Sequence, residues 1–240
     1  MATNKYSEVD MFADTDKVFK AFCKGCVETP NLCPLAKNRT ASQLEDYIFS
    51  ALEMIKQNPI AIPSPEAPGG GLIIDYSLVK AIILNSLYDP SSWPATAELF
   101  NTIVTGEGDS SQPPPPATDA TASQESIFGI KCSDIRHHTN SLADMVPVLD
   151  ARQNSSFFAP VSDQLPLKCA QWPIKAKEIY QGDFKVKTKT PVLLLTNTYD
   201  PVAPKVGAQN VTTTLEGSVL MEQEGYGVST ALARFVKYSC

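Results

Sequence analysis

Several features that would point to a common functional class are missing from this sequence. No uninterrupted apolar run approaches the roughly 18–20 residues that cross a bilayer, and residues 1–10 lack the apolar stretch of a signal peptide. Histidine is limited to the adjacent pair His137 and His138. The net charge of −6 gives no electrostatic reason to bind nucleic acid or an anionic membrane. We therefore expect neither kind of partner.

The six cysteines do not form a metal-binding pattern. Cys23 and Cys26 are the one close pair, and the two histidines are adjacent rather than at helical ligand spacing. No glycine-rich nucleotide loop is present either, so we expect no cofactor and no metal. The even count favours disulfides in an oxidising compartment; the six positions are Cys23, Cys26, Cys33, Cys132, Cys169 and Cys240.

Three N-glycosylation sequons agree with that compartment. They begin at Asn38, Asn154 and Asn210. Together with the cysteines they suggest a glycoprotein of secreted ancestry. Because no signal sequence precedes them, we expect the chain to be one that misses its beginning.

Helical patterns fill most of the first 180 residues. Helices are expected over 14–22, 44–55 and 78–87, with a fourth that starts within 89–94 and runs through 100. Ser42 to Glu45 has the capping-box spacing ahead of the second helix. The glycines at 69–71 predict a flexible turn. No internal repeat is visible.

The second half of this region is less regular. Residues 106–124 form a low-complexity stretch with four consecutive prolines, which predicts a polar loop or linker. A short apolar piece follows at 127–132. Residues 141–150 predict a helix that Pro147 interrupts.

Two strands are expected near the C-terminus. The first lies in the run from Thr190 and ends at Asp200, and the second covers 217–222 ahead of a Gly-Tyr-Gly turn at 225–227. Both runs indicate burial on two faces, as in a parallel sheet that needs further strands. A last helix is expected over 230–238.

Asp200 is the sharpest candidate for a functional residue. It can cap the turn after its strand, or it can orient and charge-stabilise a catalytic histidine. No Gly-x-Ser-x-Gly nucleophile elbow occurs in the sequence. We interpret His137 and His138 as surface residues. A rearranged triad that combines Asp200, one of these two histidines and a serine remains an open alternative.

At these residues the chain resembles the C-terminal part of secreted fungal and bacterial α/β-hydrolases of the tripeptidyl-aminopeptidase type, in the proline-iminopeptidase-like serine peptidase group. The matching segments are 14–26, 33–36, 87–94, 130–134, Cys169 with 172–173 and 196–204, and 217–227. The resemblance implies a partial α/β-hydrolase fold of the α/β class. Residues 1–185 would form a mostly helical cap or lid region, and residues 186–240 the last strands and helices of the parallel sheet.

The resemblance also implies site residues and pairings. Asp200 matches the acid of the family's Ser-Asp-His triad, whereas Val228 stands at the family's histidine position and the nucleophile elbow lies upstream of the residues present. The implied disulfides are Cys26–Cys33 and Cys132–Cys169, which leaves Cys23 and Cys240 as a third pair.

Two function hypotheses follow. By resemblance, the chain is a hydrolase-family polypeptide, and the relatives remove residues from the N-termini of peptides. We expect this chain to be inactive alone and either to need a missing N-terminal half or to self-associate. The alternative is a non-catalytic secreted binding or effector protein on a hydrolase-derived scaffold.

Overall fold

Helices dominate the protein. The computed structural model describes residues 8–63, 70–106, 120–135, 138–180 and 182–228, with the backbone alone for 120–124. In chain order the helices are α1 (Thr15–Glu28), α2 (Ala41–Gln57), α3 (Tyr76–Ser86), α4 (Trp93–Thr105), α5 (Ala120–Asp134), α6 (Leu142–Ser155), α7 (Gln164–Ala170) and α8 (Lys205–Thr214). Short 3-10 helices are η1 (Asp10–Phe12), η2 (Pro90–Ser92) and η3 (Ala159–Ser162).

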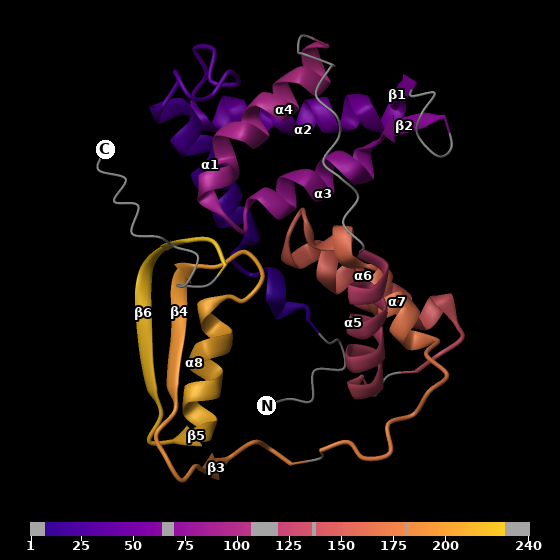
Figure 1. Ribbon diagram of the computed structural model, residues 1–240, viewed down its shortest axis with the longest axis vertical. Coiled ribbons are helices and arrows are strands. Elements are labelled where there is room, and N and C mark those ends of the chain that lie inside the picture. The colour runs from indigo at the N-terminus through magenta and orange to yellow at the C-terminus, as the bar shows by residue number, and fades with distance from the viewer. Residues whose placement is uncertain (1–7, 64–69, 107–119, 136–137, 181, 229–240) are drawn as a thin grey trace.

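The strands pair in twos. They are β1 (Ile60–Pro63), β2 (Gly71–Ile74), β3 (Val186–Lys187), β4 (Leu193–Tyr199), β5 (Leu215–Glu216) and β6 (Val219–Tyr226). Figure 1 shows α1 to α4 gathered at one end, α5 to α7 beside them, and β4, β6 and α8 as a separate layered unit. The prediction of a mostly helical chain with a small α/β portion is confirmed, although the parallel sheet at 193–226 has two strands in the described residues. The division at residue 185 stays a prediction.

The main hydrophobic core lies between the first four helices. Phe19 on α1, Leu52 on α2 and Leu87 after α3 are each no more than 2% exposed. Apolar side chains recur on one face of each helix, and burying each contributes about 1.5–3 kcal/mol. Phe158, which precedes η3, packs edge-on against Phe19 with the ring centroids 5.1 Å apart. The helices expected over the first hundred residues are thus confirmed.

The capping box of α2 lies two residues earlier than predicted. The Thr40 side chain accepts a hydrogen bond from the Gln43 backbone N–H, and the Gln43 side chain accepts one from the Thr40 N–H. Ser42 and Glu45, which have the same spacing, lie inside the helix instead. Thr40 satisfies the first free N–H groups of α2, so the helix starts at Ala41.

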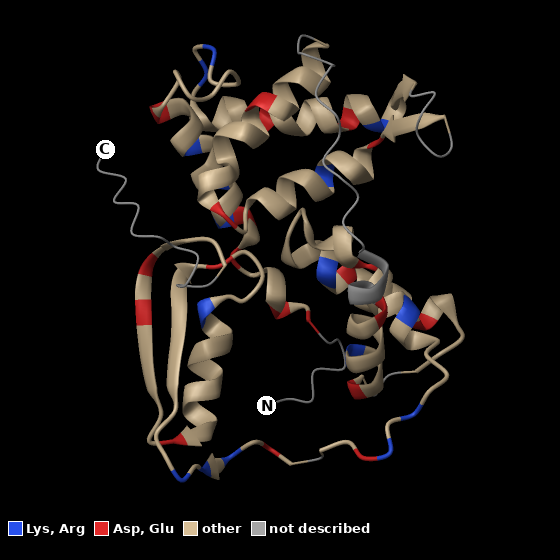
Figure 2. Ribbon diagram, in the orientation of Figure 1, with Lys and Arg blue, Asp and Glu red and all other residues tan. Residues whose placement is uncertain are grey.

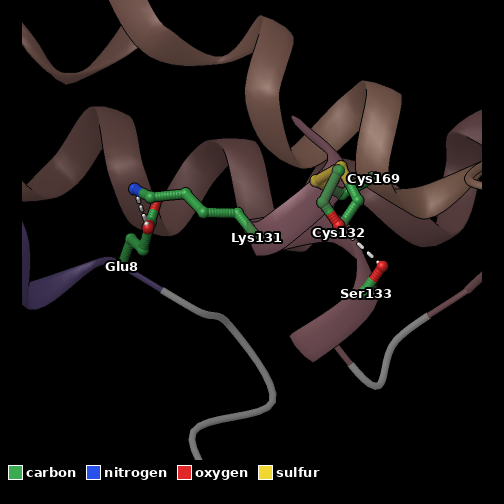
Figure 3. The surroundings of a disulfide bond; sticks show 6 residues. Glu8, Lys131, Cys132, Ser133 and Cys169 are labelled. Carbon is green, nitrogen blue, oxygen red and sulfur yellow. Dashed lines mark hydrogen bonds and ion pairs between the residues drawn. A yellow bond between two sulfur atoms is a disulfide. The ribbon is translucent and has the colours of Figure 1, made fainter. Parts of the chain in front are cut away.

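A disulfide joins α5 to α7. Cys132 and Cys169 are both fully buried and bonded to each other, and the pair forms a small core with Leu165. Figure 3 shows this bond together with the ion pair between Lys131 Nζ and Glu8 Oε1, 2.5 Å long, which ties α5 to the segment before η1. The second predicted disulfide, Cys26–Cys33, is also present. Both pairings implied by the resemblance are confirmed.

The third predicted pair, Cys23 with Cys240, stays a prediction, because Cys240 lies outside the described residues. Cys23 is a free thiol that is fully buried in the main core, and burial is the main cause that raises its pKa well above the ordinary value. Its predicted partner Cys240, like the predicted helix 230–238, lies outside the described residues.

Two predictions for the middle of the chain were wrong in part. Helix α5 begins at Ala120, so the end of the predicted 106–124 loop is helical, while 107–119 lie outside the described residues. Helix α6 continues through Pro147. Proline removes one intrahelical hydrogen bond there, but Met145 and Val148 on either side are buried and hold the helix in place.

The hairpin β1–β2 was not predicted. Ile60 pairs with Ile74 and Ile62 with Leu72 in antiparallel register. The prolines and glycines of this region indicated only a helix end and a turn. None of the helices in the described residues is both long and apolar enough to cross a membrane.

The parallel pair β4–β6 carries the C-terminal part of the fold. Leu193 pairs with Val219 and Asn197 with Gln223, and α8 connects the two strands. Strand β6 extends to Tyr226, beyond the predicted end at Glu222. Parallel strands need such a crossover because their ends lie far apart.

Candidate functional site

Asp200 lies directly after β4 and is 4% exposed. Its Oδ1 atom accepts hydrogen bonds from the backbone N–H groups of Val202 (2.9 Å) and Ala203 (2.7 Å). Aspartate stabilises turns in this way, and Pro204 then provides the start of α8. Strand β4 therefore ends at Tyr199, and the turn that follows holds the Asp200 carboxylate in one position at the end of the strand.

The turn after β6 is held against the same strand end. The Gly227 N–H donates to the Tyr199 carbonyl (3.0 Å), and the Asn197 side-chain amide donates to the Gly227 carbonyl (2.7 Å). The Val228 N–H donates to the Tyr88 carbonyl (2.9 Å). The partners lie on β4 and in the segment after α3, so the bonds hold residues 227 and 228 against Tyr199, the sequence neighbour of Asp200.

Gly227 cannot be replaced without moving the turn. Its φ of +100° is in the region that side chains disfavour, and a Cβ there would lie 2.7 Å from the Tyr88 carbonyl oxygen. The turn and the helical region are therefore in backbone contact.

Aromatic side chains surround the site. Tyr199 stacks on Tyr226 with centroids 5.3 Å apart, and Trp93 lies 6.3 Å from Tyr226. Burial, and secondarily the negative charge of Asp200, raise the pKa of Tyr88, so its phenol stays neutral at physiological pH. Thr15, the first residue of α1, donates its hydroxyl to the Pro201 carbonyl. The site is thus a junction between the helices and the strand pair.

The other predicted triad members are not brought together in the described residues. Val228, at the position where the resemblance implies a histidine, is partly buried. His138 is exposed between α5 and α6, and His137 lies outside the described residues. The serines nearest in sequence to Tyr88 bond to other groups: Ser86 to the Ile83 carbonyl and Ser91 to the Asp89 carboxylate. No group of three metal-ligating side chains occurs among the described residues.

Sequence reasoning found Asp200 but missed Asn197 and Tyr88. Asn197 is 2% exposed inside an apolar strand, and a buried amide needs a partner. This polar residue in an apolar run was the available signal. The Tyr88 contact joins segments 140 positions apart in the sequence (88 and 228), which no local pattern encodes.

The geometry defines a class of protein. A carboxylate at the end of one parallel strand, beside the turn after the next strand, is how α/β-hydrolases present a triad acid and base. Residues 155–234 match the family described as "TAP-like protein". The C-terminal part of this chain is therefore TAP-like and of the α/β-hydrolase kind, as the resemblance indicated.

Two curated relatives agree with this assignment. The tripeptidyl aminopeptidases of Streptomyces lividans and Streptomyces coelicolor are each 26% identical to the chain over 171 residues. The match covers 67% of this chain and 31% of each relative. The chain thus spans about a third of the length of the curated relatives it matches.

Proposed function

We propose that this chain is the acid-bearing C-terminal part of a serine aminopeptidase scaffold and that it does not hydrolyse peptides by itself. The observation that carries the proposal is that Asp200 is buried and hydrogen-bonded while the neighbouring turn, held by main-chain hydrogen bonds, carries a valine at position 228. Valine cannot accept a proton, and a triad that lacks its base and nucleophile loses about 10⁴–10⁶ in turnover. By similarity to the relatives, the substrate of the assembled enzyme is a peptide cleaved near its N-terminus.

The test is turnover of a tripeptidyl p-nitroanilide by the purified chain. We expect release of p-nitroaniline at the rate of the buffer alone. The Asp46→Ala variant, which removes an exposed carboxylate on α2, serves as the matched control for Asp200→Ala. Turnover that Asp200→Ala abolishes and Asp46→Ala leaves unchanged would refute the proposal.

A fluorophosphonate probe addresses the rearranged triad. Labelling of a serine that disappears when both His137 and His138 are replaced would show a nucleophile activated from elsewhere in the chain. Absence of labelling supports a chain without its own nucleophile.

A second candidate function is a non-catalytic binding protein on the same scaffold. The large core between α1 and α4 supports it, because Tyr199 and Val202 next to Asp200 pack on that core as well. A protein with such a core can fold without further segments. This candidate is favoured if the purified chain melts cooperatively as a monomer and gains no peptidase activity when it is mixed with other polypeptides.

We also propose that the protein is a secreted glycoprotein. The two disulfides fit an oxidising compartment, and Asn38, Asn154 and Asn210 are all exposed. A mass decrease of the naturally produced protein on treatment with an N-glycosidase tests it. An unchanged mass would contradict glycosylation.

A further inference from the structure

A long segment without helix or strand joins the helical region to the strand pair. Helix α7 ends at Ala170 and β3 begins at Val186, and the described residues between them form no regular element. Figure 1 shows this connection running along the outside of the protein before it reaches β3. Loops longer than about 12–15 residues without secondary structure of their own are uncommon in compact domains, and they usually serve as functional sites or linkers. The connection is therefore a candidate for a site as well as a tether.

Residues 173–179 are the part of this connection with the least structural support. The last anchor before them is the Trp172 N–H, which donates to the Cys169 carbonyl (3.1 Å). Most side chains of 173–179 are exposed, and Ile174 is 60% exposed. Within the described part of the chain, these seven residues make no hydrogen bond and no ion pair. Their backbone is therefore open to a partner that binds peptide.

Beyond this stretch the chain is tied down again. The Tyr180 ring lies against Phe184 with the ring centroids 4.7 Å apart. Strand β3 then pairs in parallel with β5, and Lys187 Nζ forms an ion pair with Glu216 Oε1 that is 2.7 Å long. The open stretch is thus short and lies between two anchored ones.

The open stretch carries two lysines. Lys175 and Lys177 are both exposed, and neither has an ion-pair partner among the described residues. Figure 2 shows basic positions along the connection, in a chain whose net charge is −6. Endoproteases that carry a carboxylate in their specificity pocket select basic side chains. Proteolytic cuts in folded proteins concentrate at exposed backbone with few hydrogen bonds. Residues 173–179 combine the two requirements.

We propose that Lys175 and Lys177 form a processing site for a trypsin-like endoprotease, which converts the protein into two chains that stay together. Water adds across the amide bond that follows one of these lysines. The lysine then ends in a carboxylate, and the next residue, Ala176 or Glu178, begins with a free amine. The inference does not depend on the proposed function, since it concerns the connection and not the surroundings of Asp200.

Contacts across the cut hold the two pieces together. The Val228 N–H donates to the Tyr88 carbonyl (2.9 Å), which joins the end of the second piece to the first. Tyr199 and Val202 of the second piece pack on the main core, whose buried residues all precede Lys175. Both disulfides also precede Lys175, so the cut opens neither of their loops. The assembled state therefore does not require an intact connection.

Lysines in other exposed settings are better protected. Lys37 lies in a turn across which the Arg39 N–H donates to the Ala36 carbonyl (2.6 Å). Lys20 and Lys24 are exposed on α1, where the backbone is bonded within the helix. A protease reaches such bonds only after local unfolding, so the cut rate there falls with the small population of the open form. Cleavage should therefore be selective for 173–179 within the described residues.

Limited digestion of the whole folded chain with trypsin tests the site. Mass spectrometry identifies the fragments, and size-exclusion chromatography under native conditions shows whether they elute together. We expect new N-termini at Ala176 or Glu178 to form before any cut after Lys37 or Lys187. The two pieces should elute as one species on the native column and separate in denaturant with reductant.

Matched variants identify the recognised side chains. Lys175→Gln/Lys177→Gln should slow the cut within 173–179 by at least about tenfold, because the specificity pocket loses its cationic partner. Lys20→Gln/Lys24→Gln removes two exposed lysines from α1 and should leave the rate of this cut unchanged. Thermal melting of each variant confirms that it folds.

The naturally produced protein gives a second reading. Its mass spectrum under reducing, denaturing conditions should contain a chain that begins at Ala176 or Glu178. Three results would overturn the inference: earlier cleavage after Lys37 or Lys187, pieces that separate on the native column, or a naturally produced protein that contains the uncut chain alone.

Discussion

The Cys132–Cys169 disulfide should contribute more stability than the Cys26–Cys33 disulfide. The two bonds close loops of different length, with sequence separations of 37 and 7. The loop-closure entropy removed from the unfolded chain then corresponds to about 4 kcal/mol for the longer loop and about 2 kcal/mol for the shorter one. Replacing both cysteines of a pair by alanine measures each contribution with the same loss of side-chain volume.

The structure adds a local effect to this difference. Helix α5 is held mainly by α7, through the small core of Cys132, Leu165 and Cys169 with Phe128 and Trp172 around it. The Cys26–Cys33 loop instead lies at the end of α1, whose face is part of the main core. Loss of the first bond should therefore release α5 as well as lower the global free energy of unfolding.

Thermal and urea unfolding followed by circular dichroism, together with hydrogen exchange, test both points. The Cys132→Ala/Cys169→Ala variant should have a Tm lower by roughly 10 °C and faster exchange in α5. The Cys26→Ala/Cys33→Ala variant should lose about half as much stability and keep α5 protected. An equal or larger loss in the second variant, with α5 unchanged in the first, would refute the reasoning.

Three further predictions concern single residues. Val228→His places an imidazole beside the Asp200 carboxylate, so an NMR titration should give it a pKa above the ordinary 6.5 or so, and a pKa that Asp200→Asn leaves unchanged would contradict this placement. Asp200→Ala leaves the part-buried backbone N–H groups of Val202 and Ala203 without their acceptor and should cost about 2 kcal/mol. Asp200→Asn keeps an acceptor oxygen and should cost clearly less; equal losses in urea unfolding would count against the turn described for Asp200. Lys80 is 5% exposed, and burial is the main cause that lowers its pKa from about 10.5. The unfolded chain then holds the Lys80 proton more tightly, so stability rises with pH between the lowered pKa and about 10.5. The stability of Lys80→Met relative to the parent chain should therefore be highest at neutral pH and should fall as the pH approaches 10; a constant difference across that range would contradict it.

The helices were predictable because their apolar spacing is local. Each of the first four follows from side chains that recur every three or four residues, and the core between α1 and α4 uses those faces. The capping box was misplaced because Thr40 with Gln43 and Ser42 with Glu45 both satisfy the same spacing. Which of the two pairs caps α2 depends on the path of the chain before the helix, and the spacing of residue types carries no information about that path.

The pairing of short strands was harder to predict. The β1–β2 hairpin joins two four-residue segments, and neither Ile60–Pro63 nor Gly71–Ile74 is long enough to show a clear alternation. At the site, Asp200 was evident from its place at a strand end. The hydrogen bond from Val228 to the Tyr88 carbonyl was not, since it depends on how the helices meet the sheet.

The hydrogen bonds of Asp200 have a consequence for how such a site can change over time. Within the part of the chain that the structure describes, its two hydrogen-bond donors are backbone N–H groups of its own turn, those of Val202 and Ala203. Residue 228 is likewise held through main-chain atoms. The acid therefore does not depend on a histidine for its burial, and the turn does not depend on its side chain for its shape. The side chain at 228 can therefore be exchanged without a change of architecture, so an exchange there that abolished catalysis would impose no folding defect for selection to act against.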